Sequence, residues 1–87
     1  MDNTFFYDRF GNKVNDGDFV MVVDDEKFLN YTPGEVLQIE YIFGRVGEFK
    51  DYYSVKFKKM NYCRFIKAVQ MRKLSNEEAM LWQLENS

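Results

Sequence analysis

The chain has 87 residues, of which 46% are hydrophobic and 18% aromatic, so it can pack one domain and is too apolar to be disordered. It has no histidine and a single cysteine, Cys63, which excludes an internal disulfide, serine–histidine or cysteine–histidine catalysis and the usual zinc-ligand sets. The formal net charge of −2 is unevenly distributed: residues 1–55 hold five basic and eleven acidic residues, whereas residues 56–74 hold seven basic residues and no acidic one.

The same composition bears on location and activity. No apolar run approaches the roughly 20 residues of a membrane-spanning helix. The first residues carry acids where a signal peptide carries bases, and with one cysteine this favours a reducing, cytoplasmic compartment. No pair of carboxylates or lysines is singled out by its spacing. We therefore expect a binding protein rather than an enzyme, with no cofactor and no metal site.

The N-terminal half predicts strands separated by turns. Residues 4–7 (TFFY) form the first strand candidate, and turns follow around Gly11 and Gly17, where a positive φ is tolerated. Residues 19–23 (FVMVV) are apolar, β-branched and too few for a helix, which is typical of a buried strand. Residues 35–43 (EVLQIEYIF) alternate in polarity. The set predicted to face the core is Leu37, Ile39, Tyr41 and Phe43.

The C-terminal half predicts further strands and then a helix. Residues 52–59 (YYSVKFKK) alternate, with Tyr53, Val55 and Phe57 expected to face inward. Residues 62–68 and 70–74 suggest two short strands, and their poor alternation predicts a bulge or a short helical turn near Val69.

Ser75 begins the only predicted helix. Ser75-Asn76-Glu77-Glu78 has the pattern of a capping box, in which Ser75 and Glu78 exchange hydrogen bonds between side chain and backbone. The predicted apolar face consists of Met80, Leu81 and Leu84, and Trp82 falls on the opposite side.

Three motifs resemble those of small Src-homology-3-like barrels. Residues 8–20 (DRFGNKVNDGDFV) are similar to the opening in which an aspartate and a GN turn precede a GD-x-V strand entry. Residues 33–39 (PGEVLQI) resemble the G-x-V-x-x-I step of KOW-type and Tudor-type barrels, and residues 72–74 (RKL) resemble a last strand. Such barrels with an appended helix are common among small bacteriophage proteins. The resemblance covers residues 8–74 and implies a binder of RNA, DNA or protein.

The predicted fold is a single, mainly β domain over residues 1–87. It is a small five-stranded, partly open, Src-homology-3-like barrel over about 4–74, followed by one short C-terminal α-helix over about 75–86. The residues predicted to be buried are Val20, Val22, Leu37, Ile39, Tyr41, Val55 and Phe57. Cys63 is expected to be a small buried side chain.

The run of bases gives the first functional hypothesis, a non-enzymatic module that binds nucleic acid through a basic sheet face. A tract with seven bases and no acid attracts phosphates, and nearby tyrosines can stack on unpaired bases. RNA and single-stranded DNA both remain open as ligands. The simpler interpretation, that these lysines only keep an exposed sheet face solvated, also remains open. The predicted residues are Lys56, Lys58, Lys59, Arg64, Lys67, Arg72, Lys73, Tyr52 and Tyr62.

The alternative hypothesis is a protein-binding module, such as a phage-type inhibitor or modulator of a host enzyme. It would dock through the acidic residues Asp24, Asp25 and Glu26 or through the helix around Trp82. Three consecutive acids do not converge on a metal, so a solvated loop is the simpler expectation for them. Trp82 is either a partner anchor or, as we expect, buried against the barrel.

Overall fold

The computed structural model describes residues 4–24, 32–45 and 52–86. The sheet strands follow the expected segments closely, and the short β2 is an addition that the sequence did not predict. In chain order the elements are β1 (Phe6–Tyr7), β2 (Lys13–Val14), β3 (Phe19–Val22), β4 (Val36–Arg45), β5 (Tyr52–Phe57), β6 (Arg64–Lys67), the 3₁₀ helix η1 (Ala68–Gln70), β7 (Met71–Lys73) and α1 (Asn76–Glu85).

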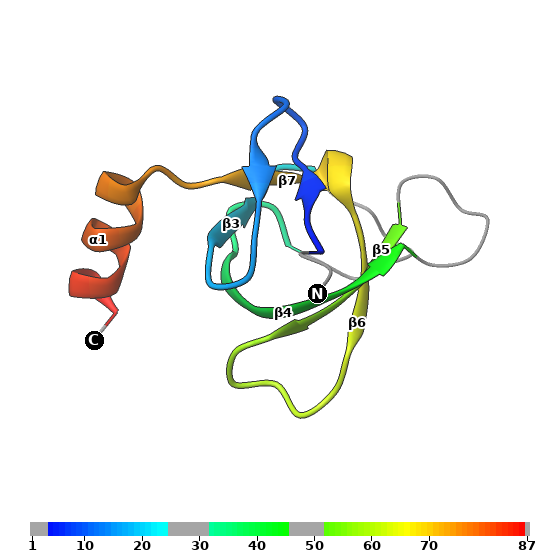
Figure 1. Cartoon of the computed structure of the whole chain (residues 1–87). Coiled ribbons are helices and arrows are strands. Elements are labelled where there is room, and N and C mark those ends of the chain that lie inside the picture. The colour runs from blue at the N-terminus through cyan, green and yellow to red at the C-terminus, as the bar shows by residue number, and fades with distance from the viewer. Residues whose placement is uncertain (1–3, 25–31, 46–51, 87) are drawn as a thin grey trace.

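Five antiparallel strands form one sheet in the order β6-β5-β4-β3-β7, and β1 pairs with β2 in a separate hairpin (Figure 1). The mainly β fold with one C-terminal helix is therefore as predicted. The sheet is open and is not closed into a barrel, since β6 and β7 stand at the two ends of its strand order. The short helical turn expected near Val69 is η1, which joins these two edge strands.

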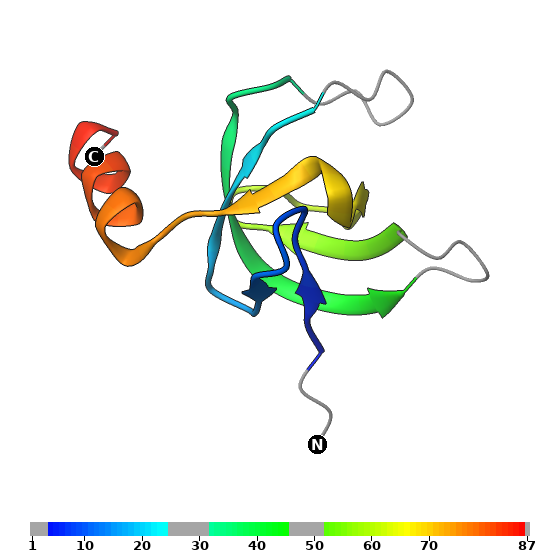
Figure 2. The same ribbon diagram turned by 90° about the horizontal axis from the view of Figure 1, so that it is seen from above.

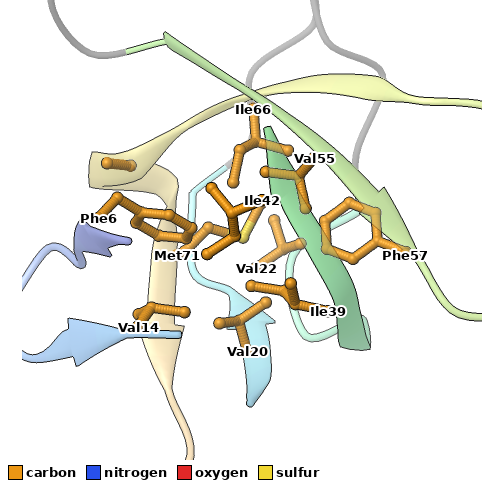
Figure 3. Close-up of a cluster of buried hydrophobic side chains, with 11 residues drawn as sticks. Phe6, Val14, Val20, Val22, Ile39, Ile42, Val55, Phe57, Ile66 and Met71 are labelled. Carbon is orange, nitrogen blue, oxygen red and sulfur yellow. The ribbon is translucent and has the colours of Figure 1, made fainter. Parts of the chain in front are cut away.

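The core lies on the concave side of the sheet, where side chains from β1 to β7 converge (Figure 3). Each fully buried aliphatic or aromatic side chain contributes about 1.5–3 kcal/mol relative to exposure. Five of the seven predicted core residues are buried: Val20, Val22, Ile39, Val55 and Phe57. Leu37 is only partly buried against this cluster, and Tyr41 is 50% exposed, so the prediction for Tyr41 was wrong.

An irregularity in β4 explains the error at Tyr41. Ile39 pairs with Phe57 and Tyr41 with Lys56, so β4 advances two residues while β5 advances one. The extra residue of such a bulge reverses the alternation beyond it. Ile42 is consequently buried, and Phe43, also predicted to face inward, is 52% exposed. The Asp16 carboxylate accepts a hydrogen bond from the Ile42 backbone N–H at 2.9 Å, next to the bulge.

The capping box that predicted α1 is present. The Ser75 hydroxyl accepts from the Glu78 N–H at 3.1 Å, and the Glu78 carboxylate accepts from the Ser75 N–H at 2.9 Å. In both Figure 1 and Figure 2, α1 stands to one side of the sheet at the end of an extended connection. No residue of α1 is buried, so the helix extends from the sheet rather than filling its core.

Candidate functional site

The seven bases of residues 56–74 fall into two groups. The first group lies on β5, on β6 and in the connection between them: Lys56, Lys58, Lys59, Arg64 and Lys67. The second group, Arg72 and Lys73, lies on β7 at the other edge of the sheet. The chain between the two groups passes through η1, so the tract extends over three strands and reaches both edges of the sheet.

Both bases of β7 hold other elements in place. The Arg72 guanidinium donates to the two carboxylate oxygens of Glu78 at 3.2 and 3.0 Å. This contact raises the pKa of Arg72, and with the Ser75 N–H it lowers the pKa of Glu78 to about 2. Lys73 lies 3.5 Å from the Asp18 carboxylate and donates to the Lys13 carbonyl at 3.0 Å. Their charges are therefore already matched by acids or by the backbone.

On β4 and β6, the two neighbours of β5 in the sheet, aromatic side chains gather on the outer side. Tyr41 and Phe43 on β4 and Phe65 on β6 are 50%, 52% and 53% exposed. The rings of Tyr41 and Phe43 lie 4.7 Å apart between centroids. Ser54 of β5 lies between the two strands, opposite Gly44 on one side and Phe65 on the other. A small side chain thus separates two sets of exposed rings.

Basic groups border these rings on the same side of the sheet. Lys56 is opposite Tyr41 in the register, and its ammonium is paired with the Glu40 carboxylate. Tyr52 is opposite Lys67, whose ammonium lies 5.8 Å from the tyrosine ring centroid. We call the set Tyr41, Phe43, Tyr52 and Phe65 the aromatic face.

The sequence placed Tyr52, Lys56 and Lys67 on this surface but missed its three most exposed rings. Tyr41 and Phe43 were assigned to the core because regular alternation was assumed through the bulge of β4. Phe65 alternates with the buried Ile66, and that two-residue period was the available signal for its exposure. Tyr62 is 61% exposed and lies in the β5–β6 connection, outside the strands.

The remaining predicted site residues do not join the aromatic face. Cys63 is exposed in the β5–β6 connection, so the expectation that it is buried was wrong. Asp24 is exposed and lies 3.7 Å from the Arg9 guanidinium. Asp25 and Glu26 lie outside the described residues.

Trp82 faces the sheet and is half-buried, with its ring 5.6 Å from that of Phe19 between centroids. The helix face that the sequence marked as apolar, formed by Met80, Leu81 and Leu84, is instead 62%, 58% and 72% exposed. Trp82 also lines a groove between α1 and the sheet, together with Lys58 and Lys59.

Within residues 4–24, 32–45 and 52–86, no three histidine, cysteine or acidic side chains gather as metal ligands would. Nor does a helix in these ranges have the length and apolarity of a membrane span. Comparisons with protein-family models, with curated proteins and with solved structures found no match.

Proposed function

We propose that this protein binds single-stranded nucleic acid on the aromatic face of β4, β5 and β6. The observation that carries the proposal is the gathering of exposed Tyr41, Phe43 and Phe65 on one side of the sheet. Base–aromatic stacking contributes about 1–3 kcal/mol per base and tolerates any base, because every base has a π-face. A row of exposed rings separated by Ser54 offers such stacking surfaces.

The charges around the aromatic face support a phosphate-bearing ligand. Lys67 borders the face directly, and Lys58 and Lys59 follow it at the end of β5. The nearest acid on β4, Glu40, is paired with Lys56, so it does not repel a phosphate as a free carboxylate would. A duplex hides its base faces, and for this reason an unpaired strand is the preferred ligand.

The likeness to Src-homology-3-like barrels belongs to this proposal as its fold hypothesis. It is supported by the five antiparallel strands and by Gly11 and Gly17, which adopt φ values of 83° and 90° at the two turns of the motif in residues 8–20. RNA and DNA remain alternatives within the proposal.

The decisive experiment is an anisotropy titration with labelled single-stranded RNA, single-stranded DNA and duplex at low salt. Phe65→Ala should weaken single-strand binding by about 1–3 kcal/mol and leave duplex binding nearly unchanged. The matched control is Phe10→Ala, since Phe10 is also a largely exposed phenylalanine but lies in the β1–β2 connection. Equal losses in both variants would speak against stacking on the aromatic face.

The charge contribution is measured by repeating the titration over a range of salt. Lys67→Gln should reduce the slope of log affinity against log salt by about 1, and Lys13→Gln on β2 should not. The proposal would be overturned if none of the three ligands bound at protein concentrations up to about 100 μM, which is the weak end of ordinary non-specific affinity.

A further inference from the structure

A second surface lies where α1 meets the sheet, and it differs in chemistry from the aromatic face. Its floor is formed by Phe19, Val36 and Leu37 from β3 and the start of β4. Trp82 on α1 and Met60 after β5 complete the apolar lining. We call this surface the helix groove. Val36, Leu37 and Met60 add aliphatic surface beside the two rings, and this part of the lining suits methyl and methylene groups better than the flat faces of bases.

The charged rim of the helix groove is basic. Lys58 and Lys59 line it and are exposed, and neither forms an ion pair with another residue of the described ranges. The acid on the rim, Glu40, is already paired with Lys56. The groove therefore presents two unmatched positive charges beside an apolar floor.

We propose that the helix groove binds a short peptide segment of another protein, in which apolar side chains are flanked by Asp or Glu. The apolar residues would lie on Phe19, Leu37 and Trp82, and the carboxylates would lie near Lys58 and Lys59. Complementary charge at a rim raises the association rate and selects the partner, and the apolar centre supplies most of the affinity.

Two features allow the groove to accept peptide side chains of different shapes. Met60 is unbranched and adapts to irregular shapes. The wall that carries Trp82 belongs to α1, which has no buried residue and is joined to β7 by an extended connection (Figure 2). Small movements of α1 can adjust the groove width without disturbing the core.

The test is a selection from a displayed library of random, tryptophan-free peptides against the whole protein. The enriched peptides should combine Asp or Glu with large apolar residues. The most enriched peptide is then synthesised and titrated while the emission of Trp82, the single tryptophan of the chain, is recorded. A change in that emission places the peptide in the helix groove.

Charge variants decide whether the rim selects the peptide. Lys58→Gln with Lys59→Asn should weaken binding about tenfold, equivalent to about 1.4 kcal/mol. Asn is chosen because residue 59 has a φ of 73°, which asparagine tolerates. Arg9→Gln with Lys13→Gln removes the same charge elsewhere and should leave peptide affinity unchanged, as should Phe65→Ala.

Three results would overturn the inference: no enriched peptide, enriched peptides without acids, or equal affinities for the two double variants. A fourth would reassign the groove to nucleic acid: a single-stranded oligonucleotide that displaces the peptide and itself changes Trp82 emission. Failure of the aromatic-face titration alone leaves the inference intact, since the rings that form the aromatic face do not line the helix groove and the two experiments use different probes.

Discussion

The carboxylate of Asp8 accepts a hydrogen bond of 2.7 Å from the backbone N–H of Lys73, which lies 65 residues further along the chain. The same carboxylate accepts from the N–H groups of Phe10 and Asn12 at 2.9 and 2.8 Å. Asp8 is only 5% exposed. One acidic side chain thus fixes the turn of the β1–β2 hairpin and attaches that hairpin to the edge strand β7.

Replacing Asp8 with Asn should lower the free energy of unfolding by roughly 1.5–3 kcal/mol, because an amide group would face N–H donors that now meet a charged acceptor. Urea unfolding measures the loss. Asp24→Asn is the matched control: its ion pair with Arg9 is long and exposed, and surface pairs contribute at most about 1 kcal/mol. Similar losses in the two variants would show that the Asp8 contacts contribute little.

Asp8 should also make stability depend on pH. Burial by itself raises the pKa of this carboxyl, but the N–H groups of Lys73, Asn12 and Phe10 outweigh burial and hold the pKa below its ordinary value of 3.8. The unfolded chain therefore takes up the proton first as pH falls, and the stabilisation present above pH 3.8 is lost through the folded pKa below it. Acid unfolding of Asp8→Asn should show a shallower fall in this range than the wild type.

Glu78 adds to acid sensitivity at a different place in the fold. The Arg72 guanidinium is the largest cause of its lowered pKa, about 2 against an ordinary 4.5. The stabilisation that the ionised Glu78 carboxylate provides is complete above pH 4.5 and disappears as the pH falls toward 2. We expect the α1 helix signal to decline in this range, and Glu78→Gln should remove that decline. A decline of equal size in Glu78→Gln would assign it to another group.

The helix should open independently of the sheet. α1 has no buried residue and is held by its cap, by the Arg72–Glu78 pair and by the Trp82–Phe19 contact. Ser75→Ala removes a cap worth about 0.5–2 kcal/mol. Amide exchange should accelerate in α1 while Val20 and Val55 stay protected, since locally opening segments exchange without global unfolding. Equal acceleration in the sheet would show that α1 and the sheet unfold together.

The sequence located β4 and β5 because their polarity alternates, and β3 because it is a short apolar run rich in β-branched residues. It located α1 because the capping box is local chemistry. It failed where contacts between residues far apart in the chain determine which side chains face the core. The bulge of β4 depends on pairing with β5 and is accompanied by a bond from Asp16, 26 residues away, and neither is visible in residues 35–43 alone. The docked side of α1 likewise depends on Phe19, a residue of β3.

The candidate site could be predicted only in part, again because contacts between distant segments determine which charges and rings are exposed. Composition identified a basic tract, but it could not show that Lys56, Arg72 and Lys73 meet acids from other segments. The tract nevertheless pointed to β5 and β6, where Tyr52 belongs to the aromatic face and Lys67 borders it. The exposed rings of Tyr41 and Phe43 could not be found without the bulge.

A pair of substitutions tests the bulge directly. Ile42→Ala should cost about 2–5 kcal/mol, as expected when a fully buried aliphatic side chain is truncated. Tyr41→Ala, its neighbour, should change stability by about 0.5 kcal/mol or less, as is usual at the surface. Regular alternation through β4 predicts the opposite order, so urea unfolding of the two variants distinguishes the registers.

Lys59 occupies a strained backbone position at the rim of the helix groove. Its φ of 73° lies in the left-handed region, which costs an ordinary residue about 1–2 kcal/mol and glycine almost nothing. After the larger entropy loss of glycine is subtracted, Lys59→Gly should stabilise the protein by about 0.5–1 kcal/mol. Lys58→Gly removes the same charge one residue earlier, where φ is not positive, and should instead destabilise it by about 0.5–1 kcal/mol. Thermal unfolding separates the two variants, and a gain in stability in both would indicate charge relief rather than backbone strain.

Lys59 also belongs to the proposed peptide site, where its ammonium would bind a carboxylate of the peptide. Lys59→Gly should therefore yield a more stable protein that binds the selected peptide less tightly, as is typical of strain held at a binding site.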